Sequence, residues 1–271
     1  MQTLALIALA LAAPSVSGHN QAASTLRNVR AVRSGDSSSF VKAVQFKHSL
    51  RVCNAYPYAT PLDVYRGKDE KISSSPLAYK ACEDFSVPIK AGDRIEFRVG
   101  DASAGTFSVA DLPRSDAVLL LVIHRHDTLS TAVAFESHVF ASLLNAQVAV
   151  IDTFKGTSKA SLKIKDHDDA SQKRAEQLRF NSVVAVNPGK YELSLASLTG
   201  EEKSNAELVA LNKESYVVMR VGVEAQQGPS YAQEIVVFPN SDAKLLHSGA
   251  MRSSVYSALV TMLALALFRR E

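Results

Sequence analysis

Several signals of chemistry are missing from this sequence of 271 residues, which has no tryptophan and only two cysteines. Without tryptophan, stacking on a sugar ring has to come from smaller aromatic side chains. The absence of a Cys-x-x-Cys pair argues against a zinc site and a thioredoxin-like redox site. A nucleophile elbow, a Walker loop, a dinucleotide fingerprint and a His-Glu-x-x-His motif are also absent. We therefore predict that the protein is not an enzyme and needs no cofactor.

A large excess of charge of one sign is also missing. The 30 basic and 27 acidic residues give a net charge of +3, and they are spread along the chain. Such an even balance of charge argues against a nucleic-acid partner. Hydrophobic residues make up 46% of the chain, which is enough to bury a core and excludes a disordered or collagen-like protein.

The N-terminus resembles a secretory signal peptide over residues 1–18. A ten-residue apolar run, Leu4–Ala13, is followed by Pro14 and the small residues Val16–Gly18. This run is too short to cross a bilayer of about 30 Å. The alternative is a hydrophobic helix that the mature protein keeps. Residues 19–43 follow as a serine-rich, mildly basic leader, interpreted as a stalk, or as a basic helix that binds a partner.

The C-terminus has the order of a glycolipid-anchor signal. The small residues Asn240–Ala243 are followed by a mostly polar spacer, Lys244–Ser254, so that residues 241–254 separate the last strand from an apolar run of 14 residues at 255–268. We expect attachment at Ser241, with Ser248 as the alternative. The competing interpretation is a short tilted transmembrane helix that ends in Arg269 and Arg270 inside the cell. Both interpretations place the bulk of the protein outside the cell, attached to the membrane.

The middle of the chain has the pattern of β-strands. Ile95, Phe97 and Val99 alternate with charged residues, which predicts a half-buried strand. Ala117–Ile123 is an unbroken apolar run, which is typical of a strand covered on both faces. Turn-forming glycines and prolines separate such segments. The fold class is therefore all-β, built as an antiparallel, immunoglobulin-like β-sandwich.

An internal repeat indicates two such domains. Segments of the first half recur in the second half at offsets between about 97 and 100 residues, a period that suits tandem sandwiches. We predict β-sandwich domains at 44–144 and 145–240, with a junction so short that the domains touch. The matched pairs are 51–56 with 149–154, 62–64 with 162–164, 89–92 with 186–189, 95–97 with 191–193, 117–122 with 216–221, and 135–140 with 235–238.

The two cysteines lie only in the first copy, where Ile151 of the second copy matches Cys53. In a secreted protein a disulfide between Cys53 and Cys82 is the default expectation. Two isolated thiols or half of a metal site are the alternatives.

The segments Arg51–Pro57, Leu62–Gly67 and Val87–Gly92 resemble the opening motifs of the DUF4397 family. The resemblance covers residues 48–140 and, more weakly, 146–239. It implies a small immunoglobulin-like β-sandwich, often in tandem on secreted or surface-anchored proteins. It also implies a distant similarity to non-catalytic accessory proteins of alginate acetylation.

Two residue pairs are the candidates for a site. His124 and His126 would project to one face of a strand and supply two ligands of a zinc or copper site. We favour the simpler interpretation, an exposed strand end. Tyr56 and Tyr58 lie in an early loop where a binding face could form, although core packing is the commoner use of such residues.

These observations favour a non-catalytic, surface-anchored module that binds, adheres or supports structure. Its expected partners are the membrane, through the anchor, and a cell-wall or matrix polysaccharide or another surface protein. The alternatives are an accessory role in polysaccharide modification and a membrane-tethered metal protein or enzyme that uses His124 and His126.

Overall fold

The computed structural model describes residues 46–141, 145–167 and 175–246. The chain divides into two compact units, Met1–Val44 and Gln45–Glu271, and all the described residues belong to the second unit. No helix within the described ranges has the length and apolar character needed to cross a membrane. The predicted signal peptide, the leader, the apolar C-terminal run and Ser248 lie outside the described residues.

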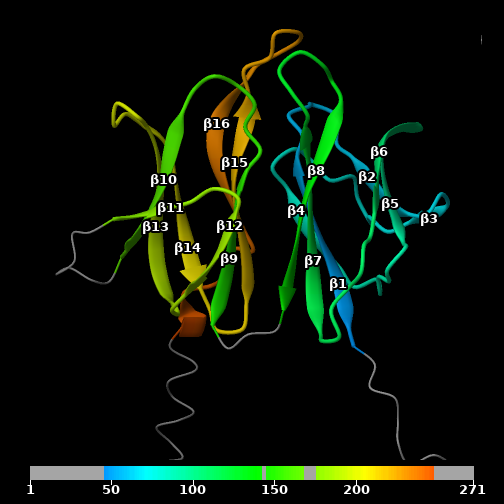
Figure 1. The fold of residues 1–271 in the computed structure, drawn as a ribbon, viewed down its shortest axis with the longest axis horizontal. Coiled ribbons are helices and arrows are strands. Elements are labelled where there is room, and N and C mark those ends of the chain that lie inside the picture. The colour runs from blue at the N-terminus through cyan, green and yellow to red at the C-terminus, as the bar shows by residue number, and fades with distance from the viewer. Residues whose placement is uncertain (1–45, 142–144, 168–174, 247–271) are drawn as a thin grey trace, which may run out of the picture. The chain divides into compact units, whose positions relative to one another are not determined.

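The first eight strands form two four-stranded sheets that enclose a core (Figure 1). We name β4-β1-β7-β8 the first inner sheet and β3-β2-β5-β6 the first outer sheet. The bounds of the strands are β1 (His48–Ala55), β2 (Asp63–Arg66), β3 (Glu70–Lys71), β4 (Cys82–Phe85), β5 (Arg94–Val99), β6 (Ala102–Ser108), β7 (Ala117–Arg125) and β8 (Val133–Ala141).

The next eight strands repeat this topology strand for strand. The second inner sheet has the order β12-β9-β15-β16 and the second outer sheet the order β11-β10-β13-β14, so each strand takes the place of the strand eight earlier. The bounds are β9 (Ala146–Asp152), β10 (Ala160–Asp166), β11 (Glu176–Leu178), β12 (Ser182–Val186), β13 (Gly189–Ser197), β14 (Glu202–Ala210), β15 (Ser215–Val223) and β16 (Tyr231–Phe238).

The β-sandwich class predicted from the sequence is confirmed, with one feature that was not predicted. In each inner sheet the first and seventh strands of the copy pair in parallel, β1 with β7 and β9 with β15. The other strand pairs are antiparallel. Alternation of apolar and polar residues reports which face is buried and is the same for both directions of pairing, so it gives no signal for a parallel pair.

Each sandwich has its own apolar core between its two sheets. In β5, Ile95 and Phe97 are fully buried and Arg94 is exposed, as the alternation predicts. The corresponding core of the second copy contains Leu193 and Tyr216, also fully buried. Each buried side chain of this size contributes about 1.5–3 kcal/mol of hydrophobic stabilisation.

A third apolar cluster joins the two inner sheets face to face. In β7, Leu119 and Leu121 point into the first core, while Leu120 and Val122 contact the second copy. This double coverage explains why the run in β7 has no polar interruption. We name this cluster the inner interface; its buried members are Cys53, Ala55, Leu120, Val122, Phe140, Ala149, Ile151, Val217, Met219 and Val221.

Candidate functional site

Three loops from the two copies meet at one end of the paired sandwiches. Because β1, β7 and β15 run in the same direction, the loops that follow these three strands emerge together (Figure 1). The Tyr56 hydroxyl donates a hydrogen bond to the Thr131 carbonyl at 2.6 Å. Across the two copies, the Gln226 amide donates to the Thr128 carbonyl at 2.8 Å. We name the loops 56–62, 126–132 and 224–230 together the loop end.

The predicted tyrosine pair lies in this loop end. The rings of Tyr56 and Tyr58 pack edge to face with centroids 6.2 Å apart. Tyr56 packs against the first core, and burial raises the pKa of its hydroxyl, while the nearby charge of Arg125 lowers it. Tyr58 is 47% exposed and Leu129, in the next loop, is 58% exposed. Of the predicted pair, Tyr58 is therefore the residue whose ring is the more accessible to solvent.

Asp127 fixes the shape of the loop that carries Leu129. Its Oδ1 accepts hydrogen bonds from the amides of Leu129 at 2.8 Å and Ser130 at 2.6 Å. Its Oδ2 lies 2.9 Å from Nδ1 of His126. The hydrogen bond to His126 has the largest effect and the hydrogen bonds from the backbone amides add to it. Together they hold the pKa of the Asp127 carboxyl well below its usual range. From the sequence, Asp127 is a candidate third metal ligand beside His124 and His126. In the structure it shapes the turn, as an aspartate three positions before Ser130 commonly does.

The two candidate metal ligands lie in different surroundings. His124 is only 2% exposed, and its Nδ1 lies 2.9 Å from the Arg125 carbonyl. Because a carbonyl only accepts, Nδ1 carries the proton, and Nε2 is left without a hydrogen-bond partner, 3.9 Å from Glu136 Oε1. His126 is exposed and paired with Asp127. Within the described residues, no group of three or more His, Cys, Asp and Glu side chains could hold a metal ion.

The predicted disulfide is confirmed. Cys53 in β1 and Cys82 in β4 are direct partners across the ladder, with Cα atoms 4.1 Å apart. Cys53 is buried in the inner interface. The bridge therefore joins an edge strand to the centre of the first inner sheet, on the side that faces the second copy.

The first of the two expected attachment residues contacts the second core. Ser241 follows β16, and its hydroxyl lies 2.9 Å from the hydroxyl of Tyr216, which is fully buried. The Tyr216 hydroxyl also accepts a hydrogen bond from the Leu211 amide at 2.9 Å. Ser241 thus closes the end of the second sandwich opposite the loop end.

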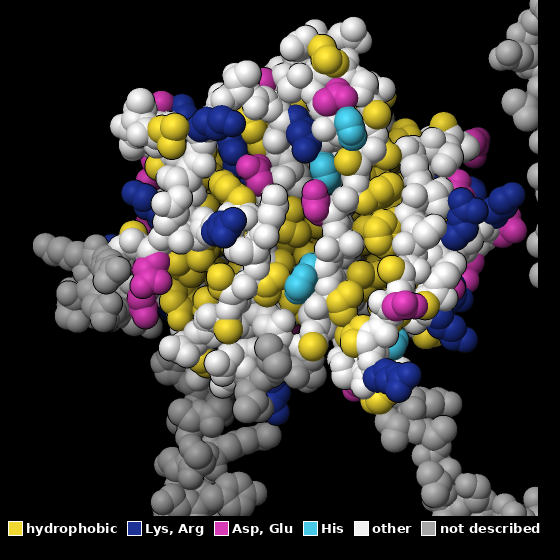
Figure 2. Space-filling model, viewed as in Figure 1, with side chains coloured by type: hydrophobic (Ala, Val, Ile, Leu, Met, Phe, Trp, Pro, Cys, Tyr) yellow, Lys and Arg dark blue, Asp and Glu magenta, His cyan; other side chains and the backbone are white. Residues whose placement is uncertain are grey.

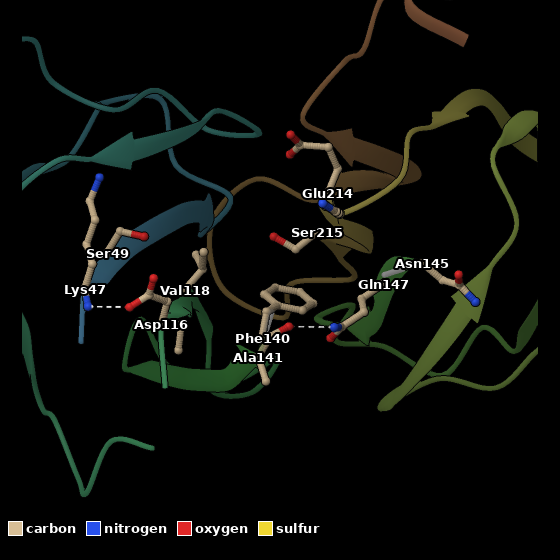
Figure 3. Close-up of a pocket in the computed structure, with 12 residues that line it drawn as sticks. Lys47, Ser49, Asp116, Val118, Phe140, Ala141, Asn145, Gln147, Glu214 and Ser215 are labelled. Carbon is tan, nitrogen blue, oxygen red and sulfur yellow. Dashed lines mark hydrogen bonds between the residues drawn. The ribbon is translucent and has the colours of Figure 1, made fainter. Parts of the chain in front are cut away.

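A pocket of about 230 Å³, lined by both polar and apolar side chains, lies at that opposite end, between the two copies (Figure 3). The backbone amide of Lys47 donates to Asp116 Oδ1 at 2.7 Å, and the side-chain Nε2 of Gln147 donates to the Ala141 carbonyl at 2.7 Å. Lys47 and Lys213 balance Asp116 and Glu214 among the lining residues. This balance, with part of the polar groups already paired, favours no charged class of ligand.

Comparisons with known proteins add little to this description. No protein-family model matches the chain, and no curated protein is significantly similar to it. Among solved structures, the chain aligns with CBMbc (family CBM26) from Eubacterium rectale Amy13K in complex with maltoheptaose. The alignment covers 72% of this chain and 98% of that chain, with 6% identity and a TM-score of 0.25. The resemblance to the DUF4397 family stays a prediction from its motifs.

Proposed function

We propose that this protein is an extracellular, membrane-anchored, non-catalytic module that binds its partner through the loop end. The observation that carries this proposal is the joining of three loops from both copies into one surface with Tyr58 and Leu129 exposed. Loops held on a rigid sandwich are the usual place for recognition in this architecture.

The direction of the chain supports this role. Arg51, near the start of β1, lies over the ring of Phe238 at the end of β16, 5.1 Å from its centroid. The first and last described strands therefore begin and end at the same end of the molecule, away from the loop end. An anchor at Ser241 or beyond it would hold the chain by that end and leave the loop end facing outward.

A polysaccharide of the cell wall or matrix is the first class of ligand to test, and a surface protein is the second. A tyrosine ring can stack on the apolar face of a sugar, while its hydroxyl bonds to the sugar hydroxyls. A leucine beside it adds apolar area. This small surface suits weak recognition of a repeated ligand by many anchored copies.

The test uses cells that display the full chain and fluorescent polysaccharides. We expect binding above that of cells without the protein, reduced about tenfold or more by Tyr58→Ala combined with Leu129→Ala. The matched control is Leu198→Ala, which removes a leucine that is 76% exposed outside the three loops. An equal loss in the control, or no change in the double variant, would contradict the assignment of the loop end.

A further inference from the structure

The inner interface has an approximate two-fold symmetry, because the same face of the same sheet is used by both copies. Pairing identifies the equivalent residues. In the first copy, Arg51 lies between Asp84 and Leu120 of the two neighbouring strands. In the second copy, Ala149 has the equivalent position, because it lies between Val183 and Val217. The strand beyond contributes His138 in the first copy and Phe238 in the second. Contacts on one side of the interface should therefore have counterparts on the other.

On one side, the Arg51 side chain fills the space between the copies. Its Nε lies 2.6 Å from Asp84 Oδ1 and its Nη2 lies 2.8 Å from Asp84 Oδ2, a bidentate pair. Its Nη1 donates to the Ser215 carbonyl, and the guanidinium lies over the Phe238 ring. This side is thus closed by a cation that stacks on the ring of the other copy.

On the other side, the equivalent space is open. Ala149 stands where the first copy has Arg51, and His138 stands where the second copy has Phe238. These two residues line a hollow of about 170 Å³. Val183, in the place of Asp84, is another lining residue and is 40% exposed. The remaining lining residues are Glu136, Ser137, Val150, Ile151, Asn181 and Ser182.

The charge of the hollow is negative. Glu136 is the one charged residue among the lining residues, and its side chain is 48% exposed. Within the described residues, its one contact with an ionisable side chain is His124, whose Nε2 lies 3.9 Å from Glu136 Oε1. Burial lowers the pKa of both His124 and His138, so both imidazoles are neutral near pH 7. Among the residues that the structure describes, no cationic side chain is therefore paired with the Glu136 carboxylate.

Two unpaired strand edges border the hollow. β8 is the last strand of the first inner sheet, and β12 is the first strand of the second inner sheet. Figure 2 shows hydrophobic side chains gathered in the middle of the view, between the two sandwiches. An extended segment can pair its backbone with such an edge and place alternate side chains into a pocket beneath it.

We infer that this hollow binds an arginine side chain of a partner protein, carried on an extended segment, in the place that Arg51 occupies on the other side of the interface. The stem of the arginine would pack on Ala149 and Val183, and the guanidinium would stack on His138 and pair with Glu136. This surface is separate from the loop end and does not depend on its function.

The probe is the fluorescent peptide Ac-Thr-Val-Arg-Val-Thr-amide, titrated with the purified full chain in detergent micelles and followed by anisotropy. The comparison peptide carries citrulline, which has the shape of arginine without its charge. We expect the arginine peptide to bind at least about fivefold more tightly than the citrulline peptide, since the charged hydrogen bond is lost. Equal affinity of the two peptides would overturn the inference.

Two variants locate the binding. Ala149→Arg supplies the hollow with an arginine of its own, as in the opposite side, and should abolish binding of the peptide. If this variant does not fold, as judged by thermal unfolding, Glu136→Gln carries the test and should weaken binding at least about fivefold. The matched control is Glu207→Gln, an exposed carboxylate on the second outer sheet. Unchanged binding in Glu136→Gln, or an equal loss in Glu207→Gln, would overturn the inference.

Discussion

The two copies share one topology but stabilise the centre of their inner sheets differently. The first copy has a disulfide between Cys53 and Cys82. The second copy has Ile151 in place of Cys53 and instead buries Arg220, which pairs with Asp152 at 3.0 Å and lies over the Phe154 ring at 4.3 Å. A covalent bond and a buried ion pair thus serve equivalent sheets.

A shared turn shows how closely the copies correspond. In the first copy the Asn54 side chain accepts a hydrogen bond from the Tyr56 amide at 3.0 Å. In the second copy Asp152 accepts one from the Phe154 amide at 3.1 Å. The residue paired with Asn54 is Ile123, and the residue paired with Asp152 is Arg220. The neutral pair Asn-Ile and the charged pair Asp-Arg are therefore alternative solutions at one position of the fold.

The largest effect is expected from breaking the charged pair. Arg220→Met leaves Asp152 without its cation in a site where the arginine is 6% and the aspartate 25% exposed. We expect a loss of about 3–5 kcal/mol in the free energy of unfolding, measured with denaturant. The double variant Asp152→Asn with Arg220→Ile installs the pair of the first copy and should recover most of that loss. A double variant as unstable as the single one would contradict the equivalence.

Removal of the disulfide is expected to cost somewhat less. Cys53→Ala with Cys82→Ala releases a loop with a sequence separation of 29. The chain-entropy model gives a loss of about 3–4 kcal/mol in the free energy of unfolding. The measurement is denaturant unfolding of the variant beside the oxidised and the reduced wild type. Reduced wild type that is as stable as the oxidised protein would show that the bond does not stabilise the first copy.

A smaller effect is expected at the contact between the copies. Arg51→Met removes the charged hydrogen bonds to Asp84 and Ser215, while Asp84 stays hydrated because its side chain is 51% exposed. We expect a loss of about 1.5–3 kcal/mol in unfolding free energy. The matched control is Arg66→Met, which breaks an exposed pair with Glu70 and should cost less than about 1 kcal/mol. Equal losses would mean that the inner interface gains nothing from Arg51.

The smallest effect concerns pH and is expected from the first copy. Burial lowers the pKa of His124 and His138 below the ordinary value of 6.5, and the second copy has Val221 and Phe238 at these places. The unfolded chain takes up these protons at higher pH than the folded chain, so stability falls as the pH falls below about 6.5.

Thermal unfolding at a series of pH values checks this expectation. His124→Val with His138→Phe installs the residues of the second copy and should flatten the fall in unfolding temperature between about pH 6.5 and 5. An unchanged slope in the double variant would assign the acid sensitivity to other groups.

Much of the architecture was predictable because it depends on local pattern. The alternation around Ile95 and Phe97 identified a half-buried strand, the apolar run of β7 identified a strand covered on both faces, and the cysteine count identified the disulfide. Each of these signals is carried by residues close together in the chain, or by the number of a rare residue.

The rest depends on partners that are distant in sequence. Arg220 interrupts an apolar strand, and nothing near it in the chain shows that Asp152, 68 residues away, is its partner. The sequence pointed to Tyr56 and Tyr58 but not to the loop of the second copy beside them, because the Gln226–Thr128 hydrogen bond that joins these loops crosses between the copies. The parallel pairing of β1 with β7 and the hollow beside His138 likewise arise from the way that whole sheets pack.

Calorimetry tests most directly the central claim that the two copies form one unit with a single loop end. The inner interface buries apolar side chains of both copies, so the sandwiches should unfold together. For the full chain in micelles we predict one transition whose calorimetric and van't Hoff enthalpies agree. Two separate transitions, with the disulfide affecting only one of them, would contradict the account and mean that the copies act as independent domains.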